Sequence, residues 1–188
     1  MEKLDDDLDL TKVGDQDKYK EGLFTLLKSE FIKTRRFPGA FFCLIGADGK
    51  PHLNIQIFEG SQEKVKAHKR GMALSLKNTA AKVAAVRYLY VAEAFLTTHD
   101  IDTPAKDMKM PYKDPKAISV LMFVDEKVDE ASLEVFQIFK GENTVRLENY
   151  PKDRKEPMII KSGSQAALLS SKGALFQNIV FKPEGPAL

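Results

Sequence analysis

Apolar residues along this chain recur first with the period of a helix and later with the pattern of strands. From Asp17 onward they return about every 3.6 residues, which predicts an amphipathic helix that ends near Arg35, just before Pro38. Asp15 or Asp17 is available to cap its start. A second amphipathic helix is predicted after Ser61, which would act as its cap, with an inward-facing stripe made of Val65, Met72, Leu76 and Ala80.

Strands account for most of the remaining apolar runs. Residues 86–97 and 118–124 are apolar at consecutive positions, which is typical of strands covered on both faces in the centre of a sheet. Shorter strand-like runs follow at 133–139, 145–150 and 158–161, while the stretch 164–181 is compatible with either a helix or a strand. This order predicts an α+β fold, in which helices pack on a predominantly antiparallel sheet in a single domain.

The clearest local signal is a hairpin formed by residues 40–46 and 52–58. If Asp48 and Gly49 are the two turn residues, Cys43 lies opposite Asn54. One face of the hairpin is then wholly apolar and belongs to the core, with Phe42, Leu44, Leu53, Ile55 and Ile57. The other face gathers Phe41, Cys43, Ile45, His52, Asn54 and Gln56.

Length and composition predict one soluble domain with a tail at each end. With 188 residues, 43% of them hydrophobic, the chain can bury most of the surface that its unfolded form exposes. Residues 1–16 are rich in acids and offer little to bury, so a mobile tail is expected there. The domain is then expected to cover residues 17–182, and a short tail with two prolines covers 183–188.

The chain also argues against several classes of protein. No apolar run approaches the roughly 20 residues that a membrane-spanning helix needs, so no membrane insertion is expected. The single cysteine, Cys43, cannot form an internal disulfide, and the N-terminus shows no basic and then apolar leader. These features predict a protein of the reducing cytoplasm.

The order of several motifs resembles a known group of proteins. The hairpin segment 46–50 (GADGK) is followed by a helix, by the strand 88–96 (YLYVAEAFL) and by 111–115 (PYKDP) before another apolar strand. Over residues 40–125 this order resembles a group of uncharacterised bacterial and prophage proteins, which usually carry Trp where this chain has Phe95. The resemblance implies a bacterial or phage setting, and it implies no activity, cofactor or catalytic residue.

Glu93 is the most unusual charged residue by position. On the alternation of its strand it shares a face with Leu89 and Val91, so its carboxylate is expected to be buried. Burial raises the pKa of a carboxylate into the range useful for acid and base catalysis. The structural alternative is an ion pair with a nearby base such as Arg87, or a position where the sheet is incompletely covered.

Cys43, His52 and Asn54 form a second candidate group, because the expected register puts them on one face. A thiol beside an imidazole that an amide orients is the arrangement of cysteine hydrolases. Diagonal neighbours in a hairpin are about 7–8 Å apart, however, and Cys43 is not at a helix N-terminus that would lower its pKa. A buried structural thiol is therefore favoured, and a small hydrolase that uses Glu93 or Cys43 is kept as an alternative function.

No motif indicates a metal or a cofactor. The three histidines lack the H-E-x-x-H spacing and a thiol pair, and no glycine-rich nucleotide loop is present. The acids Asp100, Asp102 and Asp107 lack the ligand pattern of an EF-hand. We therefore assign no catalytic, cofactor-binding or metal-ligating residue from the sequence.

The middle of the chain is basic, since residues 18–87 carry fourteen Lys and Arg against five Asp and Glu. Lys66, Lys69 and Arg70 in the second helix could hold phosphates, so nucleic-acid or other polyanion binding is kept as an alternative. The interleaved aromatics of single-strand binding are missing. The leading hypothesis is a non-enzymatic bacterial or phage cytoplasmic accessory protein that acts through protein contacts, including self-association through an edge strand.

Overall fold

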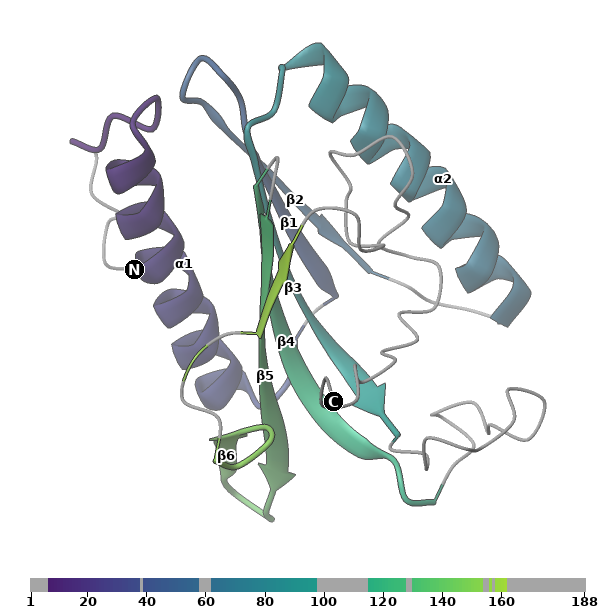
Figure 1. The fold of residues 1–188 in the computed structure, drawn as a ribbon. Helices are drawn as coiled ribbons and strands as arrows, with labels where there is room; N and C mark the ends of the chain where they lie inside the picture. The colour runs from purple at the N-terminus through teal and green to yellow at the C-terminus, as the bar shows by residue number, and fades with distance from the viewer. Residues whose placement is uncertain are drawn as a thin grey trace, which may run out of the picture.

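Helices α1 (Val13–Thr34) and α2 (Gln62–Lys82) lie on opposite faces of one antiparallel sheet in the computed structural model (Figure 1). The structure describes residues 7–37, 39–57, 62–97, 115–127, 130–153, 156 and 158–161. The predicted α+β fold with helices packed on an antiparallel sheet is confirmed. The open stretch 164–181, the tail 183–188, Ser61 and the acidic positions 100–107 lie outside the described residues.

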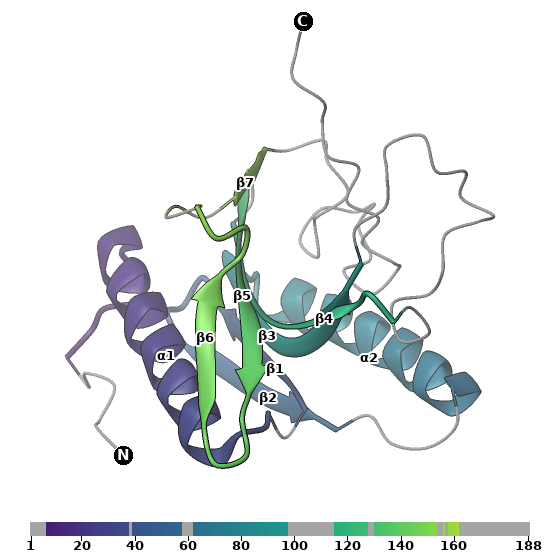
Figure 2. The same cartoon turned by 90° about the horizontal axis from the view of Figure 1, so that it is seen from below.

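The sheet runs across the molecule in the order β2-β1-β3-β4-β5-β6, and every pairing is antiparallel. β6 and β7 pair with different parts of β5, as the view from below shows (Figure 2). β3 and β4 lie in the middle, as their continuous apolar runs predict. Within the described residues the strands are β1 (Ala40–Ile45), β2 (Pro51–Gln56), β3 (Arg87–Leu96), β4 (Ile118–Lys127), β5 (Glu130–Lys140), β6 (Val145–Asn149) and β7 (Met158–Lys161).

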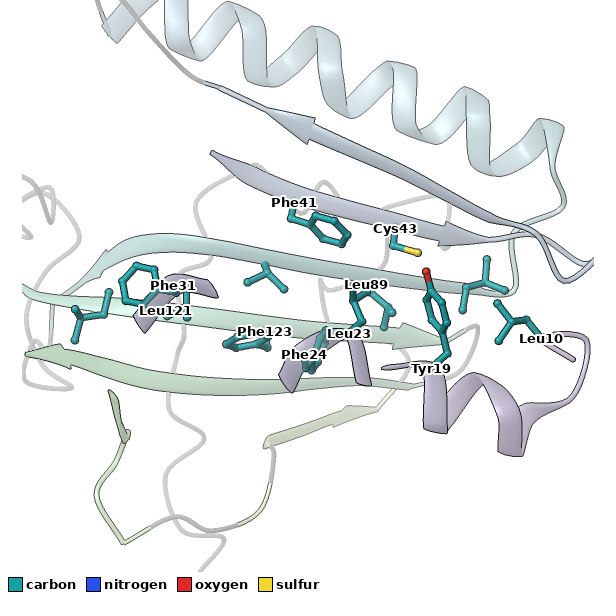
Figure 3. Close-up of a cluster of buried hydrophobic side chains, with 13 residues drawn as sticks. Leu10, Tyr19, Leu23, Phe24, Phe31, Phe41, Cys43, Leu89, Leu121 and Phe123 are labelled. Carbon is teal, nitrogen blue, oxygen red and sulfur yellow. The ribbon is translucent and has the colours of Figure 1, made fainter. Parts of the chain in front are cut away.

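Each helix covers its own hydrophobic core, because successive side chains of a strand point to opposite faces of the sheet. The core under α1 contains Tyr19, Leu23, Phe24 and Phe31 of the helix and Phe41, Cys43, Leu89 and Phe123 of the strands (Figure 3). The core under α2 contains Met72, Leu76 and Ala80 of the helix and Phe42, Leu44 and Tyr88 of the strands. Each large apolar side chain buried in this way stabilises the fold by about 1.5–3 kcal/mol.

Helix α1 begins earlier than the periodicity predicts. Lys12 is its N-cap residue and makes no side-chain capping hydrogen bond, so the expectation that Asp15 or Asp17 caps the helix is wrong. Leu10, only 6% exposed, reaches the core under α1. The expected boundary between tail and domain at residue 17 falls inside α1, and two described residues before the helix, Leu8 and Leu10, pack in or against the core.

The hairpin turn contains one more residue than the sequence suggests. The Gly46 amide donates to the carbonyl of Lys50, and the Gly49 amide donates to the carbonyl of Gly46. These bonds define a three-residue loop, 47–49, in which Gly49 has the left-handed φ of 74° that favours glycine. The register moves by one residue, so Cys43 pairs with Leu53 and not with Asn54.

A one-residue change of register exchanges the two faces of β2 relative to β1. Leu53 and Ile55 share the α1 side of the sheet with Cys43 and Phe41, where they are more than half exposed. The expectation that they belong to the core with Phe42 is therefore wrong.

None of the helices among the described residues has the length and apolar character needed to cross a membrane.

Candidate functional site

The edge strand β2 carries the most distinctive surface of the structure. Within the described residues its outer edge pairs with no other strand. Hydrogen-bonded and non-hydrogen-bonded pairs alternate along an antiparallel ladder, and Gly46 and Lys50 form a hydrogen-bonded pair. Counting from there, the backbone N–H and C=O groups of Leu53 and Ile55 point away from β1.

On the α1 side of the sheet, β2 and the residue that follows it present an exposed apolar row. The side chains of Leu53, Ile55 and Ile57 are 55%, 54% and 53% exposed. Residues 51–57 contain no Asp, Glu, Lys or Arg. Natural edge strands are usually protected from pairing by charges, bulges or prolines, and Pro51 at the start of β2 is the one such residue here.

On the α2 side, β2 presents a polar row that faces the helix. His52, Asn54 and Gln56 lie on this side because they pair with the buried residues of the α2 core, Leu44, Phe42 and Ala40. They form one wall of a groove of about 370 Å³. The opposite wall is the surface of α2 that carries His68, Gly71, Ser75 and Thr79.

A chain of hydrogen bonds connects the two walls of this groove. His68 Nε2 lies 3.1 Å from Gln56 Oε1, and Gln56 Nε2 donates to Asn54 Oδ1 at 2.6 Å. These bonds orient both amides of the β2 wall. The groove was not expected from the sequence, because the assumed register directed this polar row toward α1.

Cys43 is placed apart from the other two members of its candidate group. Cys43 is fully buried in the core under α1, whereas His52 and Asn54 lie on the α2 side of the sheet. Burial raises the pKa of the Cys43 thiol to about 12, although a hydrogen bond with Tyr19 acts in the opposite direction. Figure 3 shows the Tyr19 hydroxyl close to the sulfur. The cysteine-hydrolase arrangement is therefore ruled out, and this thiol is structural.

Glu93 does lie on the α1 side of β3, but near the end of the strand where coverage is incomplete. Its side chain is 29% exposed and its Oε1 accepts a hydrogen bond from Lys140 Nζ at 2.7 Å. The expectation of a buried carboxylate is wrong, and the ion-pair alternative holds with Lys140 as the partner and not Arg87.

The buried carboxylates are Asp125 and Glu126, which are 6% and 1% exposed. The apolar run predicts a strand that ends at Val124, whereas β4 continues to Lys127. Arg87, itself buried, donates to both carboxylate oxygens of Asp125 at 2.7 and 2.6 Å. The sequence does hold a signal for this pair. Arg87 lies at the start of one apolar strand and Asp125 follows the apolar run of the next, so assigning both residues to strands would have indicated the pair.

Arg87 also connects the sheet to α1. Its Nη1 lies 2.8 Å from Asp17 Oδ1, and Lys127 Nζ lies 3.3 Å from the same oxygen. Burial alone would raise the pKa of Asp17, but the hydrogen bond and the positive charge of Arg87 outweigh it and lower that pKa. This network is structural, because it joins α1, β3 and β4 at one end of the sheet.

Lys66, Lys69 and Arg70 all belong to α2. The positions of their side chains lie outside the described part of the chain, so the structure neither gathers nor separates these three cations. Among the described residues, no group of three or more His, Cys, Asp or Glu side chains is placed to hold a metal ion.

Comparison with known proteins gives no family for this chain: no family model, no curated protein and no solved structure matches it.

Proposed function

We propose that this protein is a non-enzymatic accessory protein of a bacterial or phage cytoplasm and that it acts through protein contacts made by the β2 edge. The observation that carries the proposal is the uncharged edge strand with three apolar side chains more than half exposed. An exposed, uncharged edge of this kind is a template for pairing with another strand. A cytoplasmic location accords with the single cysteine, because thiols stay reduced there.

The partner we propose for this edge is a second copy of the same chain, paired antiparallel about Asn54. In this register Leu53 lies opposite Ile55 of the second copy, so apolar side chains meet on the α1 side and polar side chains meet on the α2 side. The outward-pointing backbone groups of these two residues then form hydrogen-bonded pairs. If the register between the two copies were shifted by one residue, apolar side chains would lie opposite polar ones. The outward-pointing backbone groups would then no longer align.

The charges next to β2 are compatible with this pairing. Lys50 immediately precedes the strand, and its side chain is 75% exposed. In an antiparallel pair centred on Asn54, the two Lys50 residues lie about 26 Å apart, because eight residues at about 3.3 Å each separate them along the ladder. The two exposed Lys50 side chains are thus kept far apart, as a self-pairing edge requires.

Analytical ultracentrifugation over a range of concentrations tests the proposal. We expect a dimer of the unaltered protein, and we expect Ile55→Lys to be monomeric because it places a charge in the centre of the interface. Leu74→Lys is the matched control. Leu74 is 62% exposed on α2, so Leu74→Lys changes charge and surface hydrophobicity as much as Ile55→Lys does. We expect this variant to remain a dimer.

A cysteine at position 54 tests the register. Asn54 would face its own copy at a non-hydrogen-bonded position, where Cα atoms are about 4.5 Å apart, within the range for a disulfide. We expect Asn54→Cys to form a covalent dimer on mild oxidation, whereas Ser75→Cys on α2 does not. A protein that is monomeric at all concentrations, or a dimer that Ile55→Lys leaves unchanged, would overturn the proposal.

A further inference from the structure

We infer that the groove between β2 and α2 binds a small uncharged heterocycle that carries both a carbonyl group and an N–H group. This inference concerns the α2 face of the sheet, whereas the pairing proposed above uses the backbone edge of β2, and Asn54 belongs to both surfaces.

The shape of the groove fits a ring compound of modest size. Its volume of about 370 Å³ lies at the lower end of the range for small-molecule sites, roughly 300–1,000 Å³. Its floor is apolar and buried, and consists of Phe42, Leu44, Met72 and Leu76. A flat ring can lie against such a floor and remove apolar surface from water.

The chemistry of the walls favours a ligand without charge. Of the described residues that line the groove, none is Asp, Glu, Lys or Arg. A carboxylate or phosphate placed against this floor would lose its hydration without a counter-ion, which is strongly unfavourable. An uncharged ring loses much less hydration on entry.

The hydrogen-bonding groups favour a ligand that both accepts and donates. Asn54 uses its Oδ1 to accept from Gln56, and no hydrogen bond within the described residues engages its amide nitrogen, which can donate to a ligand carbonyl. On the other wall, Thr79 Oγ1 donates to the carbonyl of Ser75 at 2.9 Å, so its lone pairs can accept from a ligand N–H. The Ser75 hydroxyl adds a second acceptor. A ring that carries both a carbonyl group and an N–H group can bind to the two walls at once.

Gly71 supplies a direct way to close the groove. It lines the α2 wall, and a Cβ atom built on it meets nothing within 4 Å. A large side chain at this position therefore has room to enter the groove without displacing the core. Because glycine is unfavourable in a helix interior, Gly71→Phe is also not expected to destabilise α2.

Titration by NMR of the whole ¹⁵N-labelled protein tests the inference, with uridine as the probe because its ring carries an N–H between two carbonyls. We expect saturable shifts of the amides of Gly71 and Thr79. We expect 3-methyluridine, which lacks that N–H, to bind about tenfold more weakly, as the loss of one hydrogen bond implies. Gly71→Phe should abolish the shifts, while Gly71→Ala, which leaves most of the space open, should retain them.

Three results would overturn the inference: no shift of the groove amides at the solubility limit of uridine, equal binding of 3-methyluridine, or undiminished binding by Gly71→Phe. The spectrum of Gly71→Phe without ligand shows whether that variant is folded. If it is not, the comparison of the two nucleosides on the unaltered protein still decides.

Discussion

Arg87 in β3 and Asp125 in β4 form a two-point ion pair in which both residues are buried, with donor–acceptor distances of 2.7 and 2.6 Å. Asp17 and Lys127 extend the pair to α1 and to the end of β4. Such a pair contributes little to stability relative to apolar residues of the same shape, but losing one partner leaves an uncompensated charge in the core. Substitution of one partner therefore reveals how much the fold depends on this ion pair.

We expect Asp125→Ala to lower the free energy of unfolding by about 3–5 kcal/mol, because the Arg87 guanidinium then stays buried without its main partner. Urea denaturation followed by circular dichroism measures the change. Lys12→Ala is the control, since the Lys12–Asp9 pair is exposed and its loss should leave the free energy of unfolding almost unchanged. A cost for Asp125→Ala no larger than that of the control would mean that Arg87 is solvated.

The strands around this ion pair show which parts of the fold can be predicted from the sequence. The strand 158–161 was predicted with the bounds of β7, and the runs in 86–97 and 133–139 correspond to β3 and β5, because consecutive apolar residues are a strong signal. The ends of strands were less predictable. Asp125 and Glu126 follow the apolar run of β4, so their charges end the apolar pattern although the strand continues to Lys127. The partner of Asp125 is Arg87, which is 38 residues away in the sequence.

The candidate site was harder to predict than the fold because it depends on a single residue in a turn. Two-residue and three-residue loops around Asp48-Gly49 are both common, and the choice between them reverses which residues of β2 face α2. With the two-residue loop, the polar residues of β2 are expected on the side of the sheet where its apolar residues lie, and the apolar residues on the side of the polar ones. Local sequence fixes the turn residues but not the number of residues in the loop.

Two glycines should respond to alanine with opposite signs. Gly49→Ala should lower the free energy of unfolding by about 1–2 kcal/mol, because φ at this position is 74° and the new Cβ would lie 3.0 Å from the Thr11 amide nitrogen. Gly71→Ala should raise it by about 0.5–1 kcal/mol, because the residue is inside α2 and its Cβ meets open space. Urea denaturation of both variants measures the pair. Equal signs would contradict either the left-handed φ of Gly49 or the open space around Gly71.

Glu93→Gln should lower the free energy of unfolding by less than about 1 kcal/mol. Glu93 and Lys140 are 29% and 47% exposed, so water screens much of their attraction. The same denaturation assay measures the effect, with Asp125→Ala as the contrasting buried carboxylate. A clear rise in the free energy of unfolding of Glu93→Gln would contradict a purely structural role for this ion pair, because residues retained for chemistry are often unfavourable for folding.

The stability of the protein should decline in alkaline solution before its surface lysines titrate. Burial raises the pKa of Cys43 to about 12 from its usual 9 and the pKa of Tyr90 to about 12 from its usual 10. Each group is therefore neutral in the folded protein over a range in which it ionises in the unfolded chain. The contribution of these neutral groups to the free energy of unfolding is fully present below about pH 9. It is lost as the pH rises from there toward 12.

Urea denaturation at a series of pH values from 8 to about 10.5 measures this decline, which should reach about 1.4 kcal/mol per pH unit for each group once the unfolded chain ionises it. Cys43→Val removes the contribution that begins near pH 9, so the decline should start about one pH unit later in this variant. Replacing the exposed Val13 by Thr is the control and should leave the onset unchanged. If stability began to decline at the same pH in the unaltered protein and in Cys43→Val, the Cys43 thiol would ionise in the folded state. Rapid reaction of that thiol with a labelling reagent at pH 8 would also contradict its burial.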